Sequence, residues 1–343
     1  MSKWPRAPFY FFSIASFYLA FISCGGKSNA GQSIVPDTTL PNKAVVQRPA
    51  LDTLLFDSLV LHLSNGDKSK RWPVRDSLPA AGALLPFHRI VAYYGNLYSK
   101  NMGVLGEFPK DSMLKSLQKE VAKWQNADSM LKVIPALHYI AVTAQGSPGP
   151  GKLYRLRMPS QQIDKIISWA EEINALVFLD VQVGQSTLQK EIPPLEKYLA
   201  MPNVHLGIDP EFSMKTGKRP GTVIGTFDAA DINYAINFLT NIVRKNNLPP
   251  KVLIVHRFTQ AMVTNYKRIE PNPSVQVVMN MDGWGSPAKK INTYRQFIYP
   301  QPVEFTGFKI FYKNDTKRVG QKKEMQPEQV LKLIPQPIYI QYQ

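Results

Sequence analysis

Eight short β-rich runs alternate with longer helical patterns from Arg89 to the end of the chain. Most of these runs are almost continuously apolar, which is typical of parallel strands buried on both faces. The alternation over this length predicts an α/β fold, a closed (β/α)8 TIM barrel. An open doubly wound sheet is disfavoured because its first strand-to-helix turn would carry GxGxxG, and "AYYGNLYSKNMG" does not. The expected strands are 89–95, 133–141, 175–184, 204–212, 251–258, 275–283, 306–312 and 338–343.

Apolar residues at helical spacing predict helices between these strands. The clearest helices lie at 111–124, 160–173 and 228–245, while Pro193 and Pro194 interrupt another at 187–200. Shorter helices are expected around 259–268, 285–298 and 326–334.

The first 23 residues have the pattern of a secretory signal peptide. Lys3 and Arg6 precede an apolar run of 14 residues, 9–22, which is short for a membrane span. Cys24 follows at the end of this run, and the stretch resembles the lipobox of bacterial lipoproteins. The resemblance implies lipidation of Cys24 and export to the bacterial cell envelope, periplasmic or cell-surface, with the lipid as membrane anchor. The alternative is a stray cysteine beside an ordinary cleavage site.

Three segments follow the signal peptide. Residues 24–50 are rich in Gly, Ser, Asn and Pro and are expected to form a flexible tether. Residues 51–88 are expected to form an N-terminal preamble packed on the outside of the barrel, and 89–343 the single barrel domain. Cys24 is the only cysteine, so the fold must be stabilised by its core and not by a disulfide within the chain.

The formal net charge of +16 bears on the partner. An exported protein is not expected to bind nucleic acid, so the charge favours an anionic wall polymer, a lipid headgroup or an acidic glycan. The alternative is that Lys and Arg merely keep the outer helices soluble. The sequence indicates no particular oligomeric state.

Polar side chains gather at the carboxyl ends of the expected strands, where barrel enzymes carry their sites. Alternate residues of a strand share a face, so Asp209 and Glu211 are expected to point the same way. Carboxylates gathered at one mouth cannot all ionise independently, and one is expected to have a raised pKa. A protonated acid beside an ionised carboxylate is what glycosidic bond cleavage needs. The catalytic candidates are Asp180, Asp209, Glu211 and Asp282.

Other residues at the strand ends are candidates for substrate binding. They are Tyr93, Tyr94, His138, Gln182, His256, Asn280, Lys309, Tyr312, Tyr339 and Gln341. Several have structural alternatives: the two histidines as hydrogen-bonded core residues, Lys309 as an ion-pair partner of Asp282 or Asp180, and Asp209 and Glu211 as partners of Arg257 or Lys309. Long loops are expected at 144–159 and 213–227. Aromatic residues in or near the loops at the strand ends, namely Tyr154, Phe212 and Trp284, are expected to stack on sugar faces.

Neither a metal nor a cofactor is expected. The five histidines, at 62, 88, 138, 205 and 256, show no close ligand spacing, and the first strand carries no pair of histidines. A catalytic serine is not expected either, because the sequence has no GxSxG.

The D-x-E of "GIDPEF" is similar to the motif of Chalaropsis-type lysozymes and to the end of the chitinase-type motif. That resemblance implies that Glu211 is the proton donor and that Asp209 supports it. Longer stretches, including "LLPFHRIVAYYG", "MGVLGE", "FLDVQVGQS", "PGTVIGTFDAADIN" and "MDGWGSP", resemble a family of secreted bacterial proteins and lipoproteins. This second resemblance implies a barrel and export and gives no substrate. "MGVLGE" adds Glu107, in the first strand-to-helix loop, as a further candidate for substrate binding.

These observations predict an exported, lipid-anchored, glycoside-hydrolase-like barrel that acts on peptidoglycan or another extracellular polysaccharide. Glu211 is expected to be the general acid, Asp209 to tune it, and Asp180 or Asp282 to be the base or nucleophile. Two alternatives stay open: a non-catalytic glycan-binding or wall-binding lipoprotein, and a barrel lyase that uses Lys309.

Overall fold

Eight parallel strands close into a barrel in the computed structural model, which describes residues 49–74, 78–316, 320 and 322–343. The first strand pairs with both the second and the last, and these pairings close the ring. The predicted (β/α)8 barrel is therefore confirmed. Its strands are β1 (His88–Gly95), β2 (Lys132–Ala144), β4 (Leu176–Val181), β5 (Val204–Ile208), β7 (Lys251–Arg257), β9 (Val275–Met281), β10 (Phe305–Ile310) and β11 (Tyr339–Tyr342). The predicted signal peptide, Cys24 and most of the predicted tether lie outside the described residues.

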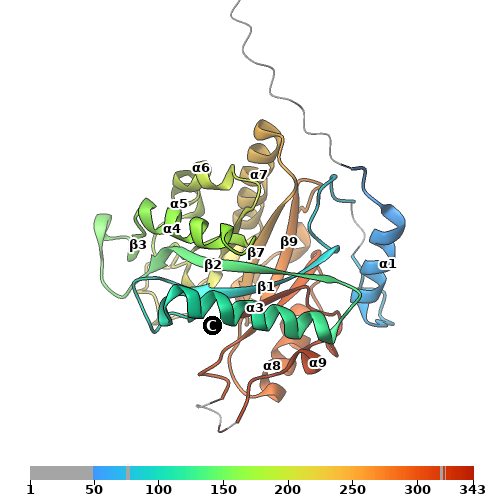
Figure 1. Cartoon of the computed structure of the whole chain (residues 1–343). Coiled ribbons are helices and arrows are strands. Elements are labelled where there is room, and N and C mark those ends of the chain that lie inside the picture. Colours follow the sequence, from blue (N-terminus) through green and yellow to red (C-terminus); the bar gives the residue numbers. More distant parts are fainter. Residues whose placement is uncertain (1–48, 75–77, 317–319, 321) are drawn as a thin grey trace, which may run out of the picture. The chain divides into compact units, whose positions relative to one another are not determined.

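Helices surround the barrel (Figure 1). The longest are α3 (Lys110–Ala127), α4 (Ser160–Glu171) and α7 (Ala229–Asn246), close to the bounds that the sequence predicted. The two prolines of the interrupted helix fall in a 3-10 turn, Pro193–Leu195, between α5 (Leu188–Glu191) and α6 (Glu196–Leu199). The shorter helices are α2 (Val104–Glu107), α8 (Pro287–Thr293), which continues into a π-helical turn at Tyr294–Ile298, and α9 (Pro327–Val330).

The prediction of a helix at 259–268 is wrong. The segment forms two 3-10 turns, Gln260–Met262 and Tyr266–Arg268, on either side of the short strand β8 (Val263–Thr264). Its β-branched residues favour strand over helix, and β8 pairs with β6 (Phe227–Asp228) just before α7. Asn265, which follows β8, has a φ of 55°, and this left-handed residue ends any helical continuation.

Alternation along the strands separates two sets of core residues. Residues such as Val91, Leu137 and Leu179 face outward and pack under the helices. Their neighbours Ile90, Ala136 and Phe178 face the barrel axis and fill its amino-terminal half. The amino-terminal half of the interior is thus mainly apolar. Its buried polar side chains include His205 and Gln276, which hydrogen-bond to the backbone of Val252 and Leu85.

Helix α1 (Thr53–Ser64), in the segment before β1, covers the amino-terminal end of the barrel. Phe56, Leu59 and Leu63 join the same core cluster as the inward-facing strand residues. Figure 1 shows α1 (blue) at one end of the barrel and β3 (Arg155–Arg157), which pairs with the end of β2, at the other. We expected this segment to pack on the outside of the barrel, and it instead closes the bottom because its apolar face completes the interior.

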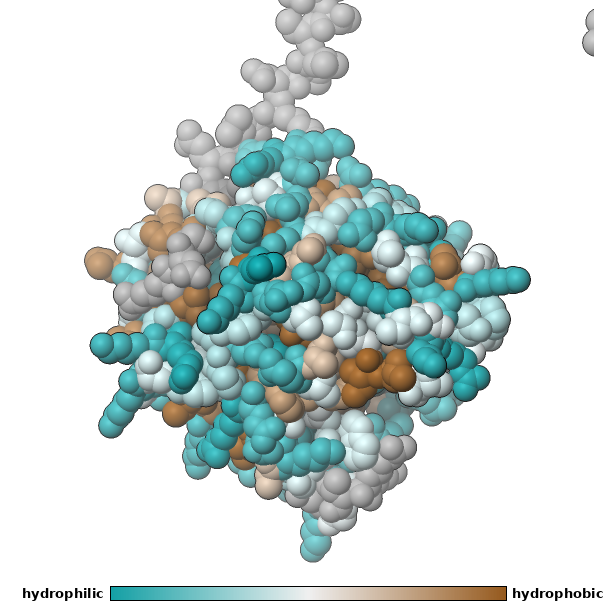
Figure 2. Space-filling model, turned by 180° about the vertical axis from the view of Figure 1, so that it is seen from behind, coloured by the Kyte–Doolittle hydropathy of each residue, from teal (hydrophilic) through white to brown (hydrophobic). Residues whose placement is uncertain are grey.

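The face of the molecule seen in Figure 2 is predominantly polar. Figure 2 shows hydrophilic side chains spread over one whole face, with brown, hydrophobic residues only scattered among them. Among the described residues, no helix is both long enough and apolar enough to span a bilayer.

Candidate functional site

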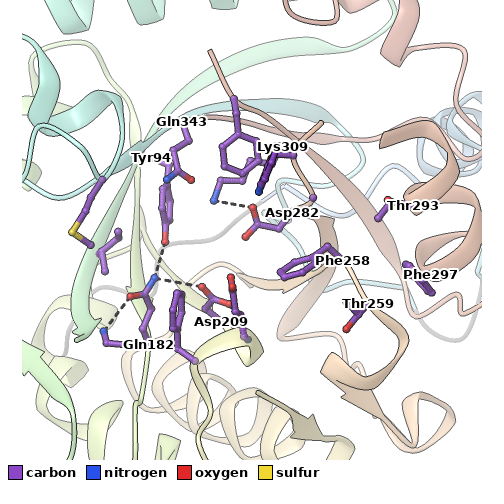
Figure 3. Close-up of a pocket in the computed structure, with 18 of the residues that line it drawn as sticks. Tyr94, Gln182, Asp209, Phe258, Thr259, Asp282, Thr293, Phe297, Lys309 and Gln343 are labelled. Atoms are coloured by element: carbon purple, nitrogen blue, oxygen red, sulfur yellow. Dashed lines mark hydrogen bonds and ion pairs between the residues drawn. The ribbon is translucent and has the colours of Figure 1, made fainter. Parts of the chain in front are cut away.

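A cavity of about 600 Å³ opens at the carboxyl ends of the strands. Its polar lining includes Gln182, Asp209, Glu211, Asp282 and Lys309, which come from four different strand ends. Figure 3 shows Gln182, Asp209, Asp282 and Lys309 around this cavity. Its aromatic lining comprises Tyr94, Phe212, Phe258, Trp284, Phe297 and Phe311. The structure therefore brings three of the four predicted carboxyl groups, Asp209, Glu211 and Asp282, to one cavity, and leaves Asp180 outside its lining.

Inward-facing positions explain which strand-end residues meet. Tyr94 continues the inward series of Ile90 and Ala92 along β1, and its hydroxyl donates to Asp180 Oδ2 at 2.9 Å. Gln182 lies two residues after Asp180, and its Nε2 is 3.4 Å from Asp209 Oδ2. These contacts join β1 to the ends of β4 and β5, and Figure 3 shows both Tyr94 and Asp209 in contact with Gln182.

Four charged groups alternate in sign across the barrel. Asp180 Oδ1 is 3.3 Å from His256 Nε2, and His256 Nδ1 is 3.0 Å from Asp282 Oδ2. Asp282 Oδ1 in turn lies 2.9 Å from Lys309 Nζ. Lys309 is also held 3.9 Å from the centre of the Tyr94 ring, as a cation on an aromatic face. Opposite charges in alternation offset the cost of burying each one.

The pKa values of these four charged groups follow from their alternating order. Burial lowers the pKa of His256, but the carboxylates of Asp180 and Asp282 outweigh it and raise that pKa to about 10. Burial raises the pKa of Asp282, and the charges of Lys309 and His256 reverse the effect and hold that pKa below its usual value. Asp180 shows the same balance, with a low pKa despite burial because of His256 and His138. At neutral pH, Asp282 is therefore ionised and His256 is charged.

Glu211, unlike Asp282, has a raised pKa. It lies in a 3-10 turn, Pro210–Phe212, whose first N–H groups are capped by Asp209: the Glu211 amide donates to Asp209 Oδ1 at 3.1 Å. Burial raises the pKa of Glu211 to about 7, with a further contribution from the charge of Asp282, while Lys309 and His256 oppose the shift. The pKa of Asp209 is also raised, first by burial. The cavity thus holds a carboxylic acid that keeps its proton near neutrality together with an ionised carboxylate.

Several predicted residues lie beneath the cavity instead of lining it. His138, Asp180, His256 and Asn280 are each completely buried in the barrel. Tyr339 and Gln341 belong to this layer too, because the Tyr339 hydroxyl is 2.6 Å from His138 Nδ1 and Gln341 Nε2 is 3.0 Å from the same atom. We expected these residues to touch the substrate, and Asp180 to be a possible base. The structure makes them the support of the cavity floor.

Three other predicted residues lie away from the cavity. Tyr93 and Tyr312 belong to the outward-facing series, and their hydroxyls hydrogen-bond to each other at 3.1 Å behind the sheet. Neighbouring positions on a strand have opposite directions, so Tyr94 could reach the interior only if Tyr93 faced outward. Glu107 lies at the rim, where Lys313 pairs with it at 2.6 Å. Arg257 also faces outward and donates to the carbonyl of Thr259.

Sequence reasoning missed part of the cavity wall. Lys289, Thr293 and Phe297 line it from α8 and the π-helical turn, and Phe258 and Thr259 line it from the end of β7. The first three are spaced four residues apart, which places them on one face of a helix. That spacing was a usable signal. Of the proposed stacking residues, Phe212 and Trp284 line the cavity and Tyr154 does not.

Comparison with known proteins gives only distant matches. No protein-family model matches the chain, and no curated protein matches its sequence. Among solved structures, a cellulase, Cel5C_n, superposes with a TM-score of 0.38 at 13% identity, over 64% of this chain and 65% of the cellulase. A sugar phosphate isomerase/epimerase from Parabacteroides distasonis superposes with a TM-score of 0.26 at 11% identity, over 67% of this chain and 78% of that one. The chain spans less than two thirds of the cellulase. The barrel fold is established by the strand pairing of this chain itself. The resemblance to a secreted lipoprotein family stays a prediction.

Proposed function

We propose that this protein is an exported, lipid-anchored glycoside hydrolase that cleaves peptidoglycan or another extracellular polysaccharide. The observation that carries the proposal is the pairing of unlike carboxyl groups in one cavity. Glu211 has a pKa of about 7 and so holds its proton up to neutral pH, and Asp282 is ionised beside Lys309 and His256. Glycosidic cleavage requires this combination of acid and carboxylate.

In this mechanism Glu211 donates its proton to the glycosidic oxygen as the bond breaks. Asp282 acts on the anomeric side, either as the base that activates water or as the nucleophile. Asp209 and Gln182 hold the turn that carries Glu211, through the backbone N–H of Glu211 and the amide of Gln182. The aromatic residues Phe212 and Trp284 supply flat apolar faces for sugar rings.

The lyase alternative receives less support from the contacts of Lys309. A Schiff-base lysine needs a free amine that can reach a carbonyl carbon. Lys309 is instead paired with Asp282 and lies over the Tyr94 ring, with only 3% of its surface exposed. The positive charge at this position is used to keep Asp282 ionised.

The test uses the full chain in a mild detergent, incubated with peptidoglycan and a panel of polysaccharides. We expect the wild type to release reducing ends from at least one polymer. The Glu211→Gln variant should lose about 10²- to 10⁴-fold in rate, the usual contribution of a general acid. Glu171→Gln, a change at an exposed glutamate of α4, is the matched control and should keep the wild-type rate.

Two results would contradict the proposal. One is release that persists in Glu211→Gln, because the proton must then come from another group. The other is a polymer that the wild type binds in a pull-down and does not cleave, which would favour the non-catalytic binding protein. Trapping of a substrate on Lys309 by borohydride would favour the lyase.

A further inference from the structure

Three side chains from three strands converge inside the barrel, beneath the floor of the cavity. They are His138 of β2, Asp180 of β4 and His256 of β7, and all three are completely buried. Asp180 Oδ1 lies 3.2 Å from His138 Nε2 and 3.3 Å from His256 Nε2. Within the described residues, no other group of three or more His, Cys, Asp or Glu side chains brings its potential ligand atoms together in this way.

The facing atoms of this cluster lack hydrogen bonds of normal geometry. Among the described residues, His138 Nε2, Asp180 Oδ1 and His256 Nε2 are buried and none has a correctly oriented donor or acceptor. The two contacts to Asp180 Oδ1 are thus electrostatic pairings within the cluster that lack hydrogen-bond geometry. Buried polar atoms without a hydrogen bond are costly, and a cation bound between these three would satisfy all of them.

The opposite side of each group is firmly held. His138 Nδ1 is 2.6 Å from the Tyr339 hydroxyl, and His256 Nδ1 is 3.0 Å from Asp282 Oδ2. Asp180 Oδ2 accepts from the Tyr94 hydroxyl at 2.9 Å. Metal-binding histidines and carboxylates are typically fixed by such outer hydrogen bonds. Binding through His138 Nε2 requires the proton on Nδ1, so the Gln341 amide, whose Nε2 lies 3.0 Å from Nδ1 and whose Oε1 has no hydrogen-bond partner among the described residues, must present its oxygen there.

Two of the three ligand-atom separations match a tetrahedral metal ion, and all three atoms lie within 4.8 Å of one another. Bonds of about 2.0–2.1 Å from zinc to nitrogen or oxygen place neighbouring ligand atoms about 3.3–3.4 Å apart, and the two shortest separations here are 3.2 and 3.3 Å. Gly207 of β5 leaves the necessary room, since a Cβ at this position would lie 2.4 Å from Asp180 Oδ1 and 2.5 Å from His138 Nε2.

We propose that His138, Asp180 and His256 bind one divalent transition-metal ion, which displaces to solvent the Nε2 proton that His256 carries in the metal-free protein. Zinc is the best match to two imidazoles and a carboxylate. The ion would lie below the cavity and stabilise the layer on which Tyr94 and Asp282 rest. The proposal goes beyond the hydrolase and does not depend on it, because none of the three ligands lines the cavity.

The test measures metal retention and stability. The full chain carrying Cys24→Ser, which removes a competing thiol, is stripped with a chelator, incubated with Zn²⁺ alone and desalted, and its bound zinc is counted by mass spectrometry. We expect one equivalent in the parent and at least about 100-fold weaker binding in His256→Gln, because a ligand is lost. His88→Gln replaces a histidine outside the cluster and should retain the full equivalent.

A milder variant and a Co²⁺ spectrum distinguish the loss of a metal ligand from misfolding of the variant. Tyr339→Phe removes only the hydroxyl beside His138 Nδ1 and should weaken zinc binding about 10- to 100-fold. Co²⁺ in place of Zn²⁺ should give the visible absorption of a tetrahedral site in the parent. Zinc should also raise the melting temperature of the parent protein.

The proposal is overturned if the stripped parent retains no zinc and shows no rise in melting temperature, in which case His256 is simply an imidazolium between two carboxylates. Equal retention in the parent and His256→Gln would overturn it as well. Glu211→Gln separates this proposal from the hydrolase, since it should slow polymer cleavage about 10²- to 10⁴-fold and leave zinc retention unchanged.

Discussion

Replacing Glu211 with Gln should stabilise the protein above neutral pH and leave its stability unchanged in acid. The carboxyl has a pKa of about 7 in the folded state against a usual value of 4.5, because it is buried and near Asp282. A group with a raised folded pKa binds its proton more tightly when folded. Its ionisation therefore costs stability as the pH rises from the unfolded value through the folded one. A glutamine of similar shape avoids this cost.

The size of the effect follows from the two pKa values. At about 1.36 kcal/mol per pKa unit, the difference between 4.5 and about 7 corresponds to about 3 kcal/mol once both states are ionised. The same linkage gives about 2 kcal/mol at pH 6 and close to zero at pH 4. Glu211→Gln should therefore gain about 3 kcal/mol at pH 8 relative to the wild type.

Urea unfolding at pH 4, 6 and 8 measures this difference directly. Glu171→Gln on the surface of α4 controls for the change from Glu to Gln itself. A stabilisation equal at all three pH values would refute the reasoning, because it would arise from packing and not from ionisation. A variant less stable than the wild type at pH 8 would show that the ionised carboxylate is stabilised in the fold.

Three further outcomes follow from the same geometry. The kcat/KM for polymer cleavage should fall about tenfold per pH unit above pH 7, since Glu211 must be protonated, and a flat profile to pH 9 would exclude it as the acid. Gly207→Ala should cost about 1–3 kcal/mol in urea unfolding because its Cβ meets Asp180 Oδ1 at 2.4 Å, whereas Gly146→Ala, with nothing within 4 Å, serves as the neutral control. Trp284→Ala should raise KM about three- to tenfold without changing kcat, as expected for a ring that binds sugar by stacking.

The strands were predictable because their signal is local. A strand buried on both faces must be apolar along its length, and all eight runs in the sequence correspond to observed strands within a few residues. The helix at 259–268 was not predictable in the same way. Its residues pair with β6, more than thirty residues earlier in the sequence, and a local sequence pattern cannot indicate such a contact.

The acidic mouth was also predictable in outline. Strands that run parallel bring their carboxyl ends to one rim, so Asp209, Glu211 and Asp282 had to be near one another. The direction of each side chain was less certain. Tyr93 and Tyr94 are adjacent and chemically alike, and only the register of β1 decided that Tyr94 faces the cavity while Tyr93 packs under the helices.

The sequence by itself determined the barrel, its strand order and the set of polar residues that end each strand, because these depend on hydrophobic pattern and chain direction. Only the tertiary structure decided the depth of each polar group within the barrel. It placed His138, Asp180 and His256, which are distant in sequence, within 4.8 Å of one another, and left Glu211 in the cavity above them. Depth sets burial and neighbouring charge, and these two quantities decide which carboxyl group keeps its proton.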